Sequence, residues 1–431
     1  MTAPVKFFTS AMQGAPQLTN AWGDLTNLLD ACLVNGFNLK TITSLTRSGG
    51  TVTATVSTGH LFQVDQVVLI AGATESGYNG EYSITGVTGT TFTYMVSATP
   101  ATPATGSPTA KAAPLGFEIA FTGTNKRAYR SQNMASNRPY LRVDNSLDPV
   151  NTTTYAKKGK VTMAQGMSDI DAFVGAQAPY DPALPNKNHI GTGSGTSAVD
   201  GWYKWYYAKV PGNSSDAAAP ETSNRNWVIV GDDRGFYLLT GFDSTINRAG
   251  YCFTDFESYR AGDGFNTLLG AADLYMSAGT GAASSGQSDW GGADIGSLFN
   301  RTLSYTGKVL MQDHVQVGGA VRAGFTSLNS NNGQTVSGYI TGIPWPNGPD
   351  YSLILHPTYL KQENTHLRGK MPGLMWVHND LNNSLADLTL VDNVAGYPGR
   401  KFLLVSSNYA NGGTNMGGVS RTAFDITGPW W

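Results

Sequence analysis

The stretch NWVIVGDDRGFYLLT, residues 226–240, contains two runs of β-favouring residues on either side of a loop of turn residues. The first run is WVIV at 227–230 and the second is FYLLT at 236–240, with GDDRG between them. Two such runs around a short loop rich in glycine and aspartate predict a β-hairpin. Both runs are apolar at consecutive positions, so we expect other parts of the protein to cover both faces of this hairpin.

The residues on either side continue the same pattern. YCFTDF at 251–256 predicts a further strand, and GDGF at 262–265 predicts the turn after it. Other runs of this kind are GFEIAF at 116–121, YLRV at 140–143, KVTM at 160–163, WYKWYY at 202–207, KVLM at 308–311, SLIL at 352–355 and KFLLV at 401–405. We therefore predict a mainly β protein in which residues 113–431 form a larger β-sandwich or barrel-like domain, with long Gly/Ser/Asn-rich loops at 278–297 and 326–336.

Residues 1–40 predict an N-terminal arm and a helix that packs on the main domain. The arm contains the strand-like run VKFF at 5–8. After it, Asn20 can cap a helix, and Gly36 supplies a stop. The apolar residues between them recur at helical spacing, at positions 22, 25, 28, 29, 32 and 33. This helix covers one side of a β-core or, alternatively, contacts another subunit.

Residues 41–112 change character to short strands between regular turns, which predicts a small β-module. GHLF at 59–62, VVLIAGA at 67–73 and YNGEY at 78–82 resemble the small immunoglobulin-like modules of phage tail and baseplate proteins. We interpret this β-module as an insertion. The Pro/Ala/Thr tract at 98–114 predicts a linker, because proline cannot donate to a central strand.

The composition describes a globular chain of low charge. Its 28 Lys and Arg and 30 Asp and Glu residues give a net charge of −2, which provides no electrostatic footprint for nucleic acid. The one dense basic group, KKGK at 157–160, predicts a solvated loop. No run of about eighteen apolar residues and no signal peptide occurs, so we expect cytosolic synthesis without membrane insertion. Cys32 and Cys252 lie far apart and predict buried free thiols.

No catalytic, cofactor-binding or metal-binding residue can be assigned from the motifs. The six histidines include no pair at three- or four-residue spacing, and no nucleophile elbow, phosphate loop or dinucleotide fingerprint occurs. Carboxylates crowd the central stretch, at positions 232, 233, 255, 257 and 263. A hydrolase pair is one reading of them, but those beside glycines are typical of turns. Trp202, Tyr203 and Trp205 either stack on a glycan or pack in the core.

Four segments together resemble a family of tailed-bacteriophage virion proteins. They are KFF at 6–8 with DACLVNGF at 30–37, the central stretch with ESYRAGD at 257–263, RGKMPGLMW at 368–376 and FDITGPW at 424–430. The resemblance implies a non-enzymatic structural component in the tail, baseplate or collar, without cofactors, assembled in the host bacterial cytoplasm. The partners it implies are other virion subunits and copies of the chain itself.

Two terminal segments are the candidate assembly contacts, through Phe7 and Phe8 of the arm and through Trp430 and Trp431 at the end of the chain. Two adjacent tryptophans expose a large apolar area unless a partner or the protein's own core covers them. The alternative function is a tail protein that binds a host receptor or a host-surface glycan, with a glycosidase activity as a variant of that reading.

Overall fold

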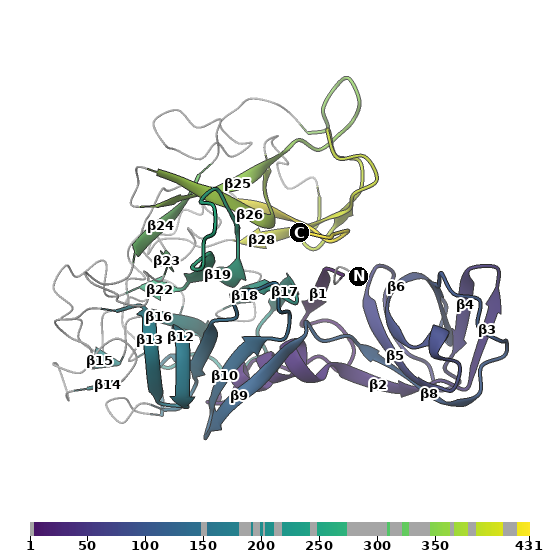
Figure 1. Cartoon of the computed structure of the whole chain (residues 1–431), viewed down its shortest axis with the longest axis horizontal. Helices are drawn as coiled ribbons and strands as arrows, with labels where there is room; N and C mark the ends of the chain where they lie inside the picture. The colour runs from purple at the N-terminus through teal and green to yellow at the C-terminus, as the bar shows by residue number, and fades with distance from the viewer. Residues whose placement is uncertain are drawn as a thin grey trace.

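The computed structural model describes residues 4–147, 153–180, 191–192, 199–200, 203–210, 218–241, 248–273, 308–310, 321–326, 345–362, 366–377, 385–407 and 420–431. In these residues the chain is mainly β, as the sequence predicts, and its antiparallel sheets form two bodies (Figure 1). The smaller body, at the right of Figure 1, is the β-module and contains strands from residues 37–112. The main domain contains the strands before and after them.

The main domain contains a large antiparallel sheet with the order β1-β17-β18-β19-β21-β23-β24-β25-β26-β29-β28-β27, and β20 pairs with β26. Its strands are β1 (Lys6–Thr9), β17 (Trp227–Asp232), β18 (Gly235–Gly241), β19 (Arg248–Asp255), β20 (Glu257–Ser258), β21 (Thr267–Gly270), β23 (Lys308–Leu310), β24 (Val321–Thr326), β25 (Leu355–Gln362), β26 (His366–Val377), β27 (Leu390–Val391), β28 (Phe402–Ser407) and β29 (Ser420–Asp425).

Strands that are distant in this order face each other. Tyr237 on β18 packs against Phe424 on β29, with ring centroids 5.3 Å apart, and its hydroxyl donates to the Pro372 carbonyl at 2.9 Å. Arg248 on β19 binds Asp387, close to β27, at 2.8 Å. The sheet therefore curves over its own face into a half-barrel.

A second sheet packs on the other face of the central strands. Its order is β22-β16-β12-β11-β10-β9, and β13 pairs with β12. The strands are β9 (Phe117–Gly123), β10 (Lys126–Ser131), β11 (Tyr140–Asp144), β12 (Lys157–Asp169), β13 (Ala172–Ala178), β16 (Tyr203–Ala208) and β22 (Ala272–Asp273). The short strands β14 (Gly191–Thr192) and β15 (Val199–Asp200) pair with each other.

The predicted hairpin is formed by β17 and β18, which pair from Trp227 with Thr240 to Asp232 with Gly235. On one face, Phe236 meets Trp205 and Phe117 of the second sheet, with ring centroids 5.9 and 6.0 Å apart. The neighbouring side chain, Tyr237, points to the opposite face and the half-barrel. Both faces of the hairpin are covered, as its consecutive apolar residues predict.

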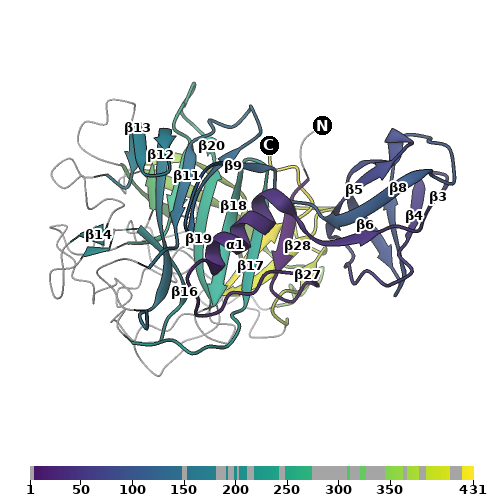
Figure 2. The same ribbon diagram turned by 90° about the horizontal axis from the view of Figure 1, so that it is seen from below.

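The predicted helix is present as α1 (Asp24–Leu29) followed by the π-helical turn η1 (Asp30–Asn35), and Gly36 ends it with φ 71°. Its apolar side lies on the main domain, where Leu25 packs against Gly159 of β12 (Figure 2). The predicted Asn20 cap is wrong. Instead, the Asn145 side chain accepts from the backbone N–H groups of Gly23 and Leu25 at 2.8 and 3.0 Å. A distant residue therefore supplies the cap.

The β-module is a seven-stranded sheet with the order β2-β8-β5-β6-β7-β4-β3 and a core of its own, separate from that of the main domain. Its elements are β2 (Phe37–Thr41), β3 (Ser44–Ser48), β4 (Thr51–Thr55), β5 (Val67–Ala73), the 3-10 turn η2 (Ser76–Tyr78), β6 (Gly80–Val87), β7 (Thr91–Met95) and β8 (Gly106–Ala112). The sheet thus begins at Phe37, before the residue 41 predicted as its start.

The prediction that the tract at 98–114 is a linker is wrong for its second half, which forms β8 between β2 and β5. Pro108 is tolerated there because it lies in a bulge of β8. Between the pairs Ala71–Thr109 and Ala73–Gly106, Ser107 and Pro108 on β8 lie opposite the single residue Gly72 on β5, which adopts φ 87°. A bulge removes the need for one ladder donor, and the carbonyl of Pro108 still accepts from the N–H of Ile42 at 2.9 Å.

The prediction that KKGK at 157–160 is a solvated loop is also wrong, because these residues begin β12 and their side chains are buried. Lys160 lies 3.5 Å from Asp144, and the Lys157 ammonium lies 5.2 Å from the centre of the Trp22 ring. Burial, with smaller effects of Arg225 and Lys158, lowers the pKa of Lys157 to about 8. A carboxylate and an aromatic ring from other parts of the chain therefore accompany this basic strand in the interior.

Two ion pairs join the β-module to the main domain. Lys6 on β1 is 2 % exposed and binds Glu81 of β6 at 2.8 Å, while also donating to the Pro114 carbonyl at 2.5 Å. Lys401 binds Asp65 at 2.7 Å. The contacts come from two different segments of the main domain, so the β-module is joined to it at two separate points.

Three further predictions have different outcomes: one is confirmed, one is shifted along the chain and one falls almost entirely outside the described residues. Cys32 and Cys252 are buried free thiols, as predicted. The strand predicted at 352–355 is shifted, because β25 begins at Leu355. Apart from Thr326, which ends β24, the predicted loops at 278–297 and 326–336 lie outside the described residues. No helix in the described part of the chain has the length and apolar character of a membrane span.

Candidate functional site: a pocket beside the terminal tryptophans

The two phenylalanines of the arm lie in the interior and not on an accessible surface. Phe7 and Phe8 belong to β1, which pairs with β17 of the central hairpin, and they are 6 % and 1 % exposed. In this structure they are therefore core residues, with little surface left for a partner. Sequence reasoning assigned them to a free arm because β1 is separated from its partner strand by more than two hundred residues.

The residues predicted to stack on a glycan are buried as well. Tyr203 and Trp205 on β16 are 1 % and 0 % exposed, and the Trp205 indole stacks on Tyr251 and donates to the Gly270 carbonyl at 2.9 Å. Trp202 lies outside the described residues. Core packing, the alternative reading of this cluster, accounts for Tyr203 and Trp205.

The terminal tryptophans are held by the protein's own main domain. The Trp430 indole donates to the Asp425 carbonyl at 2.9 Å and packs directly on Gly373, where a side-chain carbon would meet the ring at 2.1 Å. The indole of Trp431 donates to Asp232 at 2.7 Å, and the Arg234 guanidinium lies 3.8 Å from its ring centre. Both tryptophans therefore pack on the protein's own main domain, which is one of the two alternatives predicted for them. They are only partly buried.

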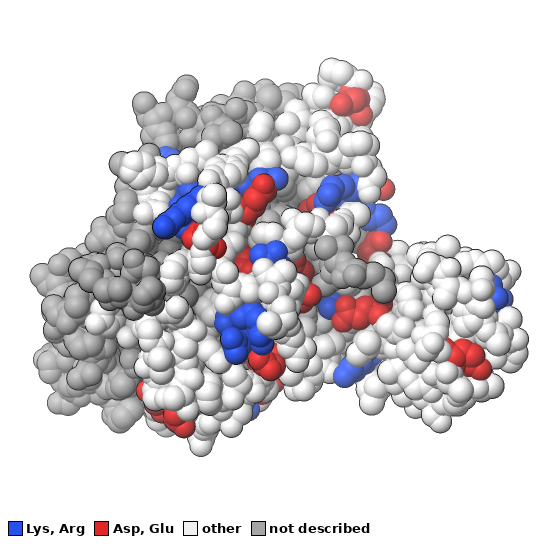
Figure 3. Space-filling view, viewed as in Figure 1, with Lys and Arg blue, Asp and Glu red and all other residues white. Residues whose placement is uncertain are grey.

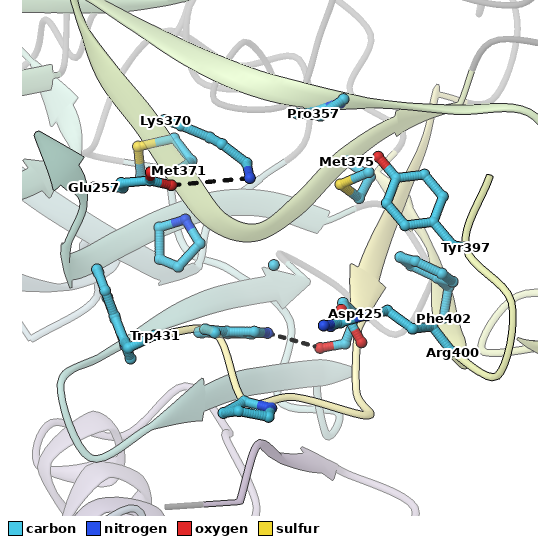
Figure 4. A pocket seen from close by; sticks show the side chains of 14 residues that line it. Glu257, Pro357, Lys370, Met371, Met375, Tyr397, Arg400, Phe402, Asp425 and Trp431 are labelled. Atoms are coloured by element: carbon cyan, nitrogen blue, oxygen red, sulfur yellow. Dashed lines mark hydrogen bonds and ion pairs between the residues drawn. The ribbon is translucent and has the colours of Figure 1, made fainter. Parts of the chain in front are cut away.

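Beside these tryptophans lies a pocket with a volume of about 180 Å³ (Figure 4). Four separate segments build it: β20, the β25–β26 hairpin, the start of β28 with the loop before it, and the chain after β29. Its apolar lining includes three prolines, two methionines and four aromatic rings, at positions 357, 372, 429, 371, 375, 397, 402, 430 and 431. Two ion pairs complete the lining.

The two ion pairs of the pocket differ in strength. Arg400 binds Asp425, whose other carboxylate oxygen accepts from the Thr427 backbone N–H at 2.9 Å, so this pair is held in place. Lys370 and Glu257 lie 3.9 Å apart on a more exposed wall, with 42 % and 63 % of their side chains exposed. Polar groups therefore stand beside apolar surface, with one pair fixed and the other free to adjust.

The carboxylate behind Trp431 is strongly perturbed. Burial raises the pKa of Asp232 to about 6, and Asp233 adds to the rise, while donation from the Arg234 N–H and the Trp431 indole opposes it. Burial also raises the pKa of Asp255, which lies 3.3 Å from Arg234. A chain of contacts thus runs from Asp255 through Arg234 to Trp431 and Asp232.

Two carboxylates of the central stretch, Asp232 and Asp263, act as acceptors in turns, as their neighbouring glycines predict. Asp232 accepts from the Arg234 N–H at 2.8 Å, and Asp263 accepts from the Phe265 N–H at 3.1 Å. Glu257 alone among the five lines the pocket. In the part of the chain that the structure describes, His, Cys, Asp and Glu side chains form no group that could hold a metal ion.

Comparison with known proteins identifies no relative: no protein-family model matches the chain, and no curated protein matches it. The pocket itself was not predicted from the sequence. The one sequence signal near it was the pair of terminal tryptophans. The other residues of the pocket wall come from segments as far back as Glu257, 173 residues before Trp430.

Proposed function

We propose that the protein is a non-enzymatic structural component of a tailed-bacteriophage virion, in the tail, baseplate or collar, and that it assembles with other virion subunits or copies of itself. The observation that carries this proposal is the β-module, a second folded body that the ion pairs of Lys6 and Lys401 hold out from the main domain. A fixed projecting body suits a subunit that must present a surface to its neighbours at a set angle.

The surface of the β-module supports this role. The described residues contain eleven well-exposed large hydrophobic side chains, and five of them lie in the β-module, which has about a quarter of the described residues: Leu39, Leu61, Val64, Val87 and Met95. Charged side chains are sparse on the face of the β-module that is seen at the right of Figure 3. Exposed apolar surface with little charge is typical of protein interfaces.

The part of this surface around Leu39 borders the main domain, because the neighbouring Asn38 packs on Gly14 of the N-terminal segment. Leu61 is 65 % exposed and adopts φ 56°, which is rare for a bulky residue. Asn38, next to the exposed Leu39, donates to the carbonyl of His60, next to Leu61, at 2.9 Å. The segments that carry the two exposed leucines therefore lie side by side. A neighbouring subunit that covered Leu39 and Leu61 would also meet the main domain.

Particles of the phage that encodes the chain provide the test. Mass spectrometry of purified particles should find the protein at a fixed copy number, and an antibody against it should label one place on the virion in electron micrographs. Absence from purified particles, or turnover of a glycan by the intact protein, would overturn the proposal.

A variant separates assembly from folding. Leu39→Glu with Leu61→Glu should leave the circular dichroism spectrum unchanged and lower incorporation into particles, because each change places a charge in the interface. Met134→Glu is the matched control, since Met134 is 78 % exposed on the main domain. Normal incorporation of the double variant would exclude this face as the contact.

A further inference from the structure

The pocket beside Trp430 combines apolar walls with charges that cancel. Its charged groups are Arg400 and Asp425, which bind each other, and Lys370 and Glu257, which lie 3.9 Å apart. With two cations and two anions, the pocket favours neither an anionic nor a cationic ligand. A purely apolar ligand would cover these ion pairs without replacing the hydrogen bonds that they make to water.

A ligand that suits this lining is neutral, has an apolar face and carries several hydroxyl groups. We infer that the pocket binds one pyranose ring of a neutral glycan. The CH groups of such a ring lie against the aromatic and proline surface, and its hydroxyls exchange hydrogen bonds with the charged groups. Lys370 donates and Glu257 accepts, and the spacing between them leaves room for a hydroxyl to bridge the two.

The size of the pocket points to a single ring. A cavity of about 150 Å³ accommodates one six-membered ring such as benzene. The pocket, at about 180 Å³, is slightly larger, as a ring with hydroxyl substituents requires. Any further sugar units of a glycan would lie outside it.

The aromatic walls are fixed before a ligand arrives. Trp430 is held between its hydrogen bond to the Asp425 carbonyl and the close approach of Gly373, and Trp431 is held by Asp232 and Arg234. Tyr397 packs on Phe402 with ring centroids 5.5 Å apart, and within the described residues its hydroxyl makes no hydrogen bond. That hydroxyl is available to the ligand, and fixed walls reduce the entropy lost on binding.

This site goes beyond the proposed function and does not depend on it. A structural subunit that holds a host-surface sugar would add adhesion to assembly, and a protein found outside virions could still bind the sugar. The two tests use different materials, because glycan binding is measured on the purified chain and assembly on particles.

The probes are the methyl glycosides of glucose, galactose, mannose and N-acetylglucosamine, followed by saturation-transfer NMR and by calorimetric titration. We expect at least one glycoside to bind. Glu257→Ala should weaken that binding at least about tenfold, and Tyr397→Phe by a smaller factor, because each removes one hydrogen-bonding group. Glu118→Ala and Tyr351→Phe are matched controls on other surfaces of the main domain and should leave the affinity unchanged.

Three results would overturn the inference. The first is no transfer to any of the four glycosides at about 20 mM, a concentration that detects even weak millimolar binding. The second is binding that both pocket variants leave unchanged, since the sugar would then occupy another surface. The third is binding of a decaproline peptide, with no glycoside bound, which would identify the pocket as a groove for an extended peptide.

Discussion

The Trp227 side chain is fully buried in the central hairpin, and its indole donates to the Pro16 carbonyl at 2.9 Å. Trp227→Ala removes this packing and leaves a cavity, so we expect the free energy of unfolding to fall by about 3–5 kcal/mol. Urea denaturation measures the change. Tyr351→Ala is the control, because Tyr351 is 70 % exposed. An unchanged midpoint for Trp227→Ala would contradict the central position of the hairpin.

Asp232 makes stability depend on pH in the direction opposite to most carboxyl groups. Its pKa is about 6 in the folded protein and 3.8 in a solvated chain. The folded state therefore binds more protons than the unfolded state between these values. Stability from this group is fully present below pH 3.8 and is lost as the pH rises through 6. Between pH 4 and 7.5 the loss amounts to about 2 kcal/mol.

The measurement is the difference in unfolding free energy between the wild type and Asp232→Asn across that pH range. Taking the difference removes the contribution of other titrating groups. Asp144 is one of them: burial alone would raise its pKa, but the charges of Lys160 and Arg142 outweigh burial and lower it. Asp392→Asn, at an exposed position, is the matched control. Parallel pH profiles for wild type and Asp232→Asn would show that Asp232 is solvated.

Among the single elements, the β8 bulge opposite Gly72 of β5 is the one that a small change should break. Gly72 has φ 87°, and a side-chain carbon there would lie 2.4 Å from the Ser107 carbonyl oxygen. Gly72→Ala should destabilise the β-module by roughly 1–3 kcal/mol and speed amide exchange in β5 and β8. Gly89→Ala, which meets open space, is the control. Equal exchange in the two variants would show that the backbone relaxes around the new methyl group.

Whether an element could be predicted depended on where its determinants lie. The hairpin at 227–240 was predictable because consecutive apolar residues indicate a strand whose two faces are both buried. Strand β8 was not, because its proline argues against a central strand and the bulge that admits Pro108 forms opposite Gly72 of a distant strand, β5. The buried lysine strand at 157–160 was missed for the same reason, since Asp144 and Trp22 come from other parts of the chain. Local pattern cannot report a partner supplied by another element.

On the scale of the whole molecule, the same limit explains the pocket. Its walls come from β20, the β25–β26 hairpin, the segment before β28 and the chain after β29. The sequence indicated one aromatic wall, at Trp430 and Trp431, but it indicated nothing about Tyr397 or Lys370. These two residues meet the tryptophans only because the half-barrel brings strands 26, 28 and 29 together.

The orientation of the β-module should depend on its two ion pairs. Removing both with Glu81→Gln and Lys401→Met leaves Lys6 buried without its carboxylate partner, so we expect a broader range of module positions. Small-angle X-ray scattering should then report a larger radius of gyration. Lys40→Met with Glu118→Gln is a control of equal charge change. An unchanged scattering curve would show that the two chain connections alone fix the orientation.

The pairing of β1 with β17 determines the order in which a ribosome can complete this protein. Phe8 emerges first but pairs with Ile229, 221 residues later, which corresponds to roughly 10–45 s of synthesis at 5–20 residues per second. The strands of the β-module all lie within residues 37–112, so it can close long before. Nascent chains arrested at residue 200 should therefore carry a protease-resistant β-module behind a cleavable N-terminal segment, and a cleavable β-module would refute this order. During that interval the apolar strand β1 has no partner strand to cover it. The speed of translation and the access of chaperones to β1 therefore affect whether this fold forms.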